Sequence, residues 1–535
     1  MIKILDCTLR DGGYVNDFNF GLKTIKEIIK GLVSANIEIV EVGFLKTSEK
    51  KQDKSLYDSV ESINQYISNS DNRTMYVAMI AYGDISIDDI SDSSKTSISG
   101  IRLTFHEKDI EEAFDFAKKL REKGYDVFIQ PVGTAFYTDE QLLKLISKVN
   151  SFKPYAFYIV DTLGSMYEKD LLRMYYLIDN NLSKEIRIGF HAHNNLQLAF
   201  SNAQKLINLA VKRDIIIDAS VFGMGRGAGN LATELITRFI NENIKDKYDV
   251  GNILNVMDSY ILPIKSRFDW GYSAPYYIAA VNNCHPNYAS FLIGKQTLCI
   301  NDVKSIINTI PVSERHLYNA NLITKLYSEH LSHFIDDKES LSYLKSIVEE
   351  KKILILAPGR SLIEYRNKIV DFIKLEKPII IAVNFIPDFC DYDIIFISNL
   401  KRFNNLDTAV DLIKEKLICT SNITVRDDIK VINYINYLNE NSIITDNAGL
   451  MLLNIIKNMN FTDAFLAGFD GFDFNINKNY YNQELMYNIV ENDQIKINEA
   501  VTQYFEKYRI NSNIKFITPT IYDKEELNNV QVSNI

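Results

Sequence analysis

The chain has 535 residues and a formal net charge of −10, with 46% hydrophobic and 24% charged residues. This length predicts two or three domains, and the composition is typical of folded protein. The negative balance argues against general nucleic-acid binding, which needs a basic surface. The five cysteines lie far apart, which favours free thiols in a reducing cytoplasm and excludes a dense disulfide framework. No apolar run reaches the roughly 18 residues of a membrane span.

The first half of the sequence alternates short β-branched runs with amphipathic segments of helical spacing. Runs that are apolar throughout are typical of parallel strands buried on both faces. Eight alternations over about 240 residues predict an α/β fold of the (β/α)₈ type, and an open doubly wound sheet is the alternative. The expected strands are residues 3–7, 37–44, 75–82, 100–105, 126–132, 156–161, 186–193 and 215–222.

Two histidines end the seventh run, in the order His191-Ala192-His193. Side chains two residues apart on a strand point to the same face, so one metal ion can take both imidazoles. The alternative is a pair of surface or hydrogen-bonded histidines at a strand end. Their place at the carboxyl end of a barrel strand, where active sites gather, favours a metal site.

Arg10 and Asp11 follow the first run, and Glu41 lies within the second. Asp11 adds a carboxylate to the two imidazoles, and this set suits a divalent metal with positions left open for substrate oxygens. Arg10 can bind a substrate carboxylate or stabilise an enolate. The alternatives are a simple ion pair between Arg10 and Asp11 and a buried role for Glu41 as the partner of Arg10.

Other polar residues are expected at the same rim of the barrel. Asn230 ends the glycine-rich loop after the eighth run, where its amide oxygen can bind the metal or orient a ligand. The candidates for substrate contact are Arg102 and Thr104 from the fourth run, Asp161 and Thr162 from the sixth, and Arg226 from the glycine-rich loop.

Three motifs in this order resemble those of the DRE-TIM metallolyases, the HMG-CoA-lyase-like superfamily, and within it the 4-hydroxy-2-oxovalerate aldolases. They are Leu9-Arg10-Asp11-Gly12, His191-Ala192-His193-Asn194 and the loop at 223–231. The resemblance covers about residues 1–300 and implies a TIM barrel with Mn²⁺ or Mg²⁺ on Asp11, His191 and His193. It also implies that the metal chelates a 2-oxo acid while Arg10 stabilises the enolate. Asn230 matches an asparagine that approaches the metal in some members, and Glu41 matches a glutamate of the lyase and synthase branches.

The sequence departs from the aldolase pattern just after Asp11. The bacterial aldolases carry a catalytic histidine two or three residues later, whereas this chain continues Gly12-Gly13-Tyr14. Tyr14 can serve as acid or base if its hydroxyl lies near the metal, although a phenol with a pKa of about 10 needs help at neutral pH. The alternative is that Tyr14 packs or positions the substrate.

Residues 251–345 predict a mostly helical extension. The resemblance implies that it covers the barrel mouth and supports a homodimer. His285 precedes a proline, which biases the preceding residue toward extended geometry. We therefore expect His285 to be structural in a turn, and the alternative is that it reaches the active site.

Residues 351–535 predict a smaller Rossmann-like α/β domain. A strand–turn–helix segment near Gly359 offers backbone N–H groups that can hold phosphate, but its single glycine argues against NAD. Three short patches resemble sialyltransferase-like, nucleotide-sugar-binding proteins of bacterial surface-glycan pathways. They imply a nucleotide or nucleotide-sugar site, against the alternative of a non-catalytic assembly domain. Its residues would be Gly359, Arg360, Ser361, Asn384, Asp446, Asn447 and Asp470.

We expect a cytoplasmic carbon–carbon lyase whose barrel, residues 1–250, makes or breaks a bond between a pyruvate-like enolate and an aldehyde. The C-terminal resemblance implies a role in bacterial surface-polysaccharide or sugar biosynthesis and a transferase-like second activity. One alternative is a Claisen-type synthase or lyase acting on an acyl-CoA, which Glu41 and the missing histidine favour. The other is a silent barrel that scaffolds the C-terminal domain.

Overall fold

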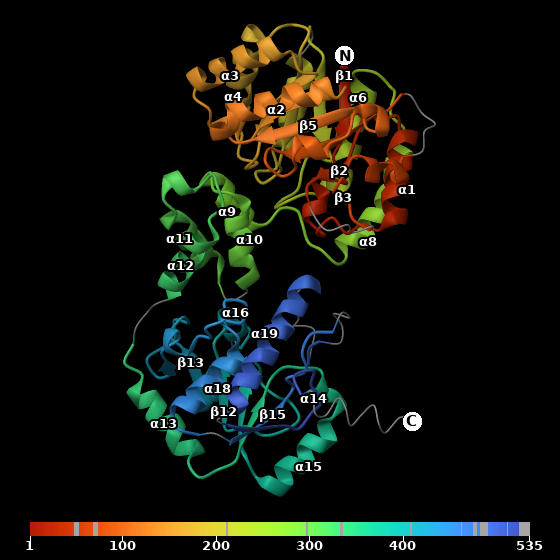
Figure 1. Ribbon diagram of the computed structural model, residues 1–535. Helices are drawn as coiled ribbons and strands as arrows, with labels where there is room; N and C mark the ends of the chain where they lie inside the picture. Colours follow the sequence, from red (N-terminus) through yellow and green to blue (C-terminus); the bar gives the residue numbers. More distant parts are fainter. Residues whose placement is uncertain are drawn as a thin grey trace, which may run out of the picture. The chain divides into compact units, whose positions relative to one another are not determined.

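The chain forms two compact units in the computed structural model (Figure 1). The structure describes residues 1–47, 53–67, 73–209, 212–295, 298–331, 335–406, 409–461, 463–473, 479–481, 491–510 and 512–523. The first unit comprises Met1–Ser290 and Ile310–Tyr318, and the second comprises Phe291–Thr309 and Asn319–Ile535. Residues 251–345 therefore contribute to both units.

The first unit is built around a closed barrel of eight parallel strands. The strand order is β1-β9-β8-β7-β6-β5-β4-β2, and pairing of β1 with β2 closes the cylinder. This closure confirms the barrel and excludes the open sheet. The strands are β1 (Ile2–Asp6), β2 (Ile39–Leu45), β4 (Met75–Ala81), β5 (Gly100–Phe105), β6 (Asp126–Pro131), β7 (Ala156–Asp161), β8 (Arg187–Ala192) and β9 (Ile215–Ala219), and β3 (Leu56–Tyr57) pairs with β2 outside the cylinder.

Among the described residues, six α-helices belong to the barrel. Five follow β1, β5, β6, β7 and β8, and the sixth follows β9. In the described parts of the connections from β2 to β5, short 3₁₀ helices stand in their place, namely η2 (Glu61–Tyr66), η3 (Ile87–Asp89) and η4 (Ser93–Lys95). The α-helices are α1 (Leu22–Ser34), α2 (Ile110–Glu122), α3 (Asp139–Phe152), α4 (Glu168–Asn181), α5 (Ala199–Leu209) and α6 (Thr233–Asn243).

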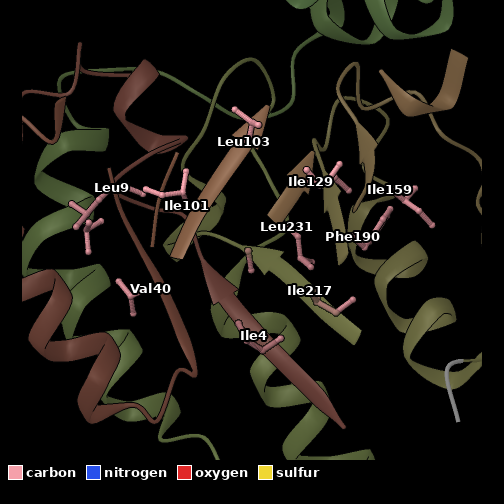
Figure 2. Packing of buried hydrophobic residues seen from close by; sticks show 14 of the residues in the cluster. Ile4, Leu9, Val40, Ile101, Leu103, Ile129, Ile159, Phe190, Ile217 and Leu231 are labelled. Carbon is pink, nitrogen blue, oxygen red and sulfur yellow. The ribbon is translucent and has the colours of Figure 1, made fainter. Parts of the chain in front are cut away.

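Alternation along each strand divides the barrel core into two layers. Ile4, Ile101 and Leu103 belong to the large cluster that packs with the surrounding helices, and Figure 2 shows them within it. Leu5 belongs to a separate cluster that also contains Tyr158. Because successive strand side chains point to opposite faces, the residue between Ile101 and Leu103 must point into the barrel. That residue is an arginine, Arg102.

The region after the barrel is mostly helical, as the sequence predicts. Helix α7 packs against α1, where a Cβ atom at Gly31 would lie only 2.2 Å from Cγ2 of Val256. No helix in the described ranges is both long and apolar enough to cross a membrane. The elements are α7 (Val250–Val256), a π-helical turn η8 (Met257–Ile261), α8 (Leu262–Lys265), α9 (Ala274–Val281), α10 (Pro286–Lys295), α11 (Ile300–Thr309), α12 (Ala320–Leu331) and α13 (Lys338–Val348).

The second unit contains a parallel sheet in the order β14-β13-β12-β11-β10-β15-β16. The chain starts at β10, builds outward to β14, and then returns to add β15 on the other side of β10. The strand order therefore reverses between the paired strands β10 and β15, and open α/β sheets bind ligands at such a topological switch point. The strands are β10 (Ile353–Leu356), β11 (Ile379–Val383), β12 (Ile394–Ile397), β13 (Leu417–Thr420), β14 (Lys430–Ile432), β15 (Asp463–Ala467) and β16 (Asn513–Phe516).

Helices connect these strands in the second unit. They are α14 (Ser361–Glu364), α15 (Arg366–Glu376), α16 (Leu400–Asn404), α17 (Val410–Ile413), α18 (Ala448–Asn458) and α19 (Glu491–Arg509). Asn447 caps α18, because its side-chain oxygen accepts a hydrogen bond from the backbone N–H of Leu450.

Candidate metal centre

Asp11, His191 and His193 converge at the carboxyl end of the barrel. Each offers one ligand atom, and the three atoms lie within 4.8 Å of one another. Oδ2 of Asp11 is 3.9 Å from Nε2 of His191 and 3.8 Å from Nδ1 of His193. These separations are too long for hydrogen bonds but suit ligands that share one ion.

Three buried polar atoms at this point lack a hydrogen-bond partner among the described residues: Oδ2 of Asp11, Nδ1 of His193 and Oδ1 of Asn230. The amide nitrogen of Asn230 donates to the carbonyl of Met224, 3.1 Å away. Buried acceptors without donors are costly, and all three atoms are of types that bind a cation. The residues therefore fit a divalent metal ion.

Glycine is required in the loop next to these ligands. A Cβ atom at Gly225 would lie 2.3 Å from Nδ2 of Asn230 and 3.2 Å from Oδ2 of Asp11. A side chain at this position would press on both residues. The glycine-rich loop after β9 thus lets the backbone approach the centre closely.

The protonation states of the ligands also suit metal binding. Burial acts to raise the pKa of the Asp11 carboxyl, but Arg10 and the two histidines together lower it below its usual range. Burial lowers the pKa of His193 to about 3. At neutral pH, Asp11 is therefore a carboxylate and His193 is a neutral imidazole, which are the forms that ligate metals.

Asp218, in β9, contacts the ring nitrogen of His191 that lies away from Asp11. Its Oδ2 lies 3.0 Å from Nδ1 of His191. Burial raises the pKa of Asp218, but Arg102 and His191 outweigh it and hold the pKa below its usual value. An ionised Asp218 accepts a hydrogen bond from Nδ1–H, which leaves the lone pair on Nε2, the nitrogen that faces Asp11. Asp218 is not among the residues predicted from the sequence, because its only signal there is a carboxylate within an isoleucine run.

Two buried arginines connect the ligands with Glu41. Arg10 donates from Nε to Glu41 and from Nη1 to Asp11, both at 2.8 Å. Arg102 donates from Nη1 to the same Glu41 oxygen at 2.6 Å and also donates to Asp218. The network fixes the guanidinium of Arg10 beside the candidate metal ligand Asp11.

Two predictions need correction here. Arg102 has no exposed side-chain surface and Glu41 is 1% exposed. Inward alternation in β5 encloses Arg102 inside the barrel, where it contacts Glu41 and Asp218 and has no exposed surface to offer a substrate. Glu41 contacts the two arginines, which matches the alternative of a buried partner for Arg10 and does not support a role in the chemistry.

Asp161 and Thr162 also have structural partners. The Asp161 carboxylate accepts hydrogen bonds from the backbone N–H groups of Ser165 and Met166 at 3.0 and 3.1 Å. Burial raises its pKa to about 6. The Thr162 hydroxyl accepts from the backbone N–H of Gly133 at 2.9 Å. Both side chains therefore bind loop backbone, and their contact with substrate stays a prediction. Thr104 is half-buried near the end of β5.

Tyr14, Arg226 and His285 form a group around the glycine-rich loop. The Arg226 guanidinium lies 4.1 Å from the ring centre of Tyr14, and its Nη1 is 3.3 Å from Nε2 of His285. Tyr14 is 41% exposed and also packs edge-on against Phe18. His285 has the expected turn contact, since its Nδ1 accepts from the backbone N–H of Asn287 at 3.2 Å, but its ring also reaches Arg226.

The second unit has a cavity of about 300 Å³ at its switch point. Residues that follow β10, β11 and β15 line it, together with the start of α18. The lining includes five of the seven residues predicted for a nucleotide site: Gly359, Asn384, Asp446, Asn447 and Asp470.

The carboxylate of Asp470 binds the turn before α14. Asp470 accepts hydrogen bonds from the backbone N–H of Ser361, at 2.7 Å, and from the Ser361 hydroxyl. The expectation that the turn at Gly359, Arg360 and Ser361 holds a phosphate is therefore corrected, because a carboxylate of the chain already occupies these donors.

Comparisons with known proteins cover the first half of the chain. Residues 1–259 match the family model described as HMGL-like. A 4-hydroxy-2-oxovalerate aldolase of Geobacillus genomosp. 3 is 27% identical over 270 residues, which is 49% of this chain and 77% of the relative. The enzyme of the same name from Thermomicrobium roseum is 27% identical over 271 residues, covering 49% and 73%. The crystal structure of the HMG-CoA lyase from Brucella melitensis matches 49% of this chain and 98% of its own, at 14% identity and a TM-score of 0.42.

Proposed function

We propose that the chain is a divalent-metal-dependent aldolase, because its residues 1–259 match the HMGL-like family model. It makes or breaks the carbon–carbon bond between a pyruvate-like 2-oxo acid and an aldehyde. The observation that carries this proposal is the convergence of Asp11, His191 and His193 beside the doubly anchored Arg10. The names of the aldolase relatives agree with this reaction.

The residues divide the chemistry between them. Asp11, His191 and His193 would hold Mn²⁺ or Mg²⁺, which supplies Lewis acidity for the carbonyl and carboxylate oxygens of the 2-oxo acid. Arg10 stays protonated, because Glu41 and Asp11 outweigh the effect of burial and raise its pKa. Its guanidinium is held in place before the reaction, so it can stabilise the enolate oxygen without reorganisation.

The proposal is tested by metal-dependent cleavage. The full chain is treated with EDTA, reconstituted with Mn²⁺ or Mg²⁺, and given 4-hydroxy-2-oxopentanoate, and released pyruvate is measured. We expect pyruvate only with metal present. Metal-independent cleavage would contradict the proposal, and so would release of free CoA from an acyl-CoA with no pyruvate from the hydroxy-oxo acid. The second result would support the Claisen-type alternative.

We further propose that the second unit binds a nucleotide or nucleotide sugar, which would connect the aldolase with sugar or surface-polysaccharide biosynthesis. The support is the position of the cavity at the switch point. Lys295 and the N-terminus of the eleven-residue helix α18 line this cavity, and both favour an anion. A phosphate would contact them, since Asp470 occupies the turn at Ser361.

Calorimetric titration of the full chain with CMP and with UDP tests this second proposal. We expect saturable binding of one of them, weakened at least tenfold in Lys295→Gln. A matched control is Lys374→Gln, which changes an exposed lysine of α15. No binding of either nucleotide would overturn the proposal.

A further inference from the structure

Arg226 and His285 meet next to the metal centre, although they come from distant parts of the sequence. Arg226 belongs to the glycine-rich loop after β9, and His285 precedes α10. Their closest nitrogens, Nη1 and Nε2, are 3.3 Å apart. Arg226 contributes to the electrostatic environment of both Asp11 and His193, and His193 contributes to that of His285.

The contact between Nη1 of Arg226 and Nε2 of His285 brings two hydrogen-bond donors together, as the hydrogen bonds of the His285 ring indicate. Nδ1 accepts the backbone N–H of Asn287 at 3.2 Å, so it carries no proton. Burial, followed by Arg226, lowers the pKa of His285 to about 3, and the ring is neutral at pH 7. A neutral imidazole whose Nδ1 is unprotonated carries its proton on Nε2. A guanidinium has hydrogen-bond donors and no acceptor. Two N–H donors therefore face one another.

The charge of Arg226 also lacks compensation. Arg10 and Arg102 each bind two carboxylates, whereas Arg226 has no ion pair with a carboxylate in the described part of the chain. Its guanidinium also lies over the ring face of Tyr14 at 4.1 Å, which orients it without neutralising it. A fixed cation and a fixed N–H donor that share no acceptor form a site for an anionic oxygen.

We propose that Arg226 and His285 bind an anionic substituent, a carboxylate or a phosphate, on the aldehyde substrate. Arg226 Nη1 and His285 Nε2 donate to the same oxygen of that group. This inference rests on the proposed aldolase function and adds the substrate class, namely acidic aldehydes. The 2-oxo acid has its own partners in the metal ligands and Arg10, so the second donor pair is assigned to the other substrate.

Enolisation of pyruvate alone and its condensation with an aldehyde distinguish binding of the 2-oxo acid from binding of the aldehyde. Exchange of deuterium from D₂O into the methyl group of pyruvate needs only the 2-oxo acid. Condensation is then measured with matched aldehydes: succinic semialdehyde against butanal for the carboxylate, and glyceraldehyde 3-phosphate against glyceraldehyde for the phosphate. We expect the wild type to prefer the anionic member of at least one pair, and the preferred pair identifies the anion.

Variants then test the two residues. In Arg226→Gln, we expect kcat/KM for the preferred anionic aldehyde to fall about 10–100-fold, with less than about threefold change for its neutral partner and for methyl exchange. Arg226→Lys should recover part of the loss. His285→Phe removes the donor and should lower the same preference, whereas His285→Gln retains an N–H donor and should restore it. The control is Arg238→Gln, which changes an exposed arginine of α6 paired with Glu242.

Two results would overturn the inference. Equal losses for neutral and anionic aldehydes would assign the pair to the reacting oxygen, and a matching loss of methyl exchange would assign it to the 2-oxo acid. Absence of exchange in the wild type is a different result, because it would refute the proposed function itself and the inference with it.

Discussion

Oδ2 of Asp218 lies 3.0 Å from Nδ1 of His191, so one buried carboxylate sets which nitrogen of this histidine faces Asp11. The register of β8 on β9 pairs Phe190 with Ile217, so the next residues on the two strands, His191 and Asp218, are neighbours. The contact sets the tautomer of a candidate metal ligand, which makes Asp218 a positioning residue.

We predict that Asp218→Asn weakens divalent-metal affinity by about 10–100-fold, because a neutral amide no longer favours the proton on Nδ1. Calorimetric titration of the EDTA-treated chain with Mn²⁺ measures this change. Asp115→Asn, an exposed position in α2, is the matched control. An affinity within twofold of the wild type in Asp218→Asn would refute the role of Asp218.

Arg10→Lys should lower the turnover rate at saturating metal by about 100-fold or more. Lysine retains a positive charge but lacks the planar set of donors with which Arg10 contacts Glu41 and Asp11. Pyruvate methyl exchange at several metal concentrations separates the loss of rate from a loss of metal. Turnover equal to that of the wild type would show that Arg10 is only an ion-pair partner of Asp11.

Arg102→Met should destabilise the fold by about 3–5 kcal/mol, because it leaves the buried carboxylates of Glu41 and Asp218 without their shared cation. Urea unfolding of the first unit measures the change, and Arg238→Met is the surface control. Unchanged stability combined with a raised KM would restore the original expectation that Arg102 binds substrate.

Asp6 makes stability depend on pH. Burial raises the pKa of its carboxyl to about 6, and hydrogen bonds from Thr8 and Thr233 only partly offset this effect. The folded state therefore holds a proton that the unfolded state releases above its ordinary pKa of about 3.9. This contribution to stability is complete below about pH 4 and is lost as the pH rises through about 6.

We expect the unfolding free energy of the wild type to fall relative to Asp6→Asn by about 3 kcal/mol between pH 4 and pH 7, as an upper limit. Urea titrations of both proteins at several pH values give this difference. Parallel pH profiles for the two proteins would show that Asp6 does not titrate in this way.

The barrel strands were predictable because each is a short β-branched run, and such runs are typical of strands that are buried on both faces. The metal-ligand candidates were predictable for a related reason, since they follow such runs at the carboxyl ends of strands. Asp218 was not identified, and a place for His285 at the active site was only the alternative to a structural turn, because both roles depend on contacts with residues far away in sequence. Arg102 was misassigned because a charge in a strand indicates a functional site unless its buried partners are known. The homodimer and the cytoplasmic location stay predictions.

The proposed lyase chemistry is tested most directly by enolisation of pyruvate, which requires no knowledge of the aldehyde. Deuterium incorporation into the pyruvate methyl group is followed by mass spectrometry with Mn²⁺ or Mg²⁺, for the wild type and for Asp11→Asn. We predict metal-dependent exchange in the wild type that EDTA abolishes, and at least a hundredfold slower exchange in Asp11→Asn. Exchange that persists without metal, or that is unchanged in Asp11→Asn, would contradict the assignment of Asp11, His191 and His193 as the metal centre.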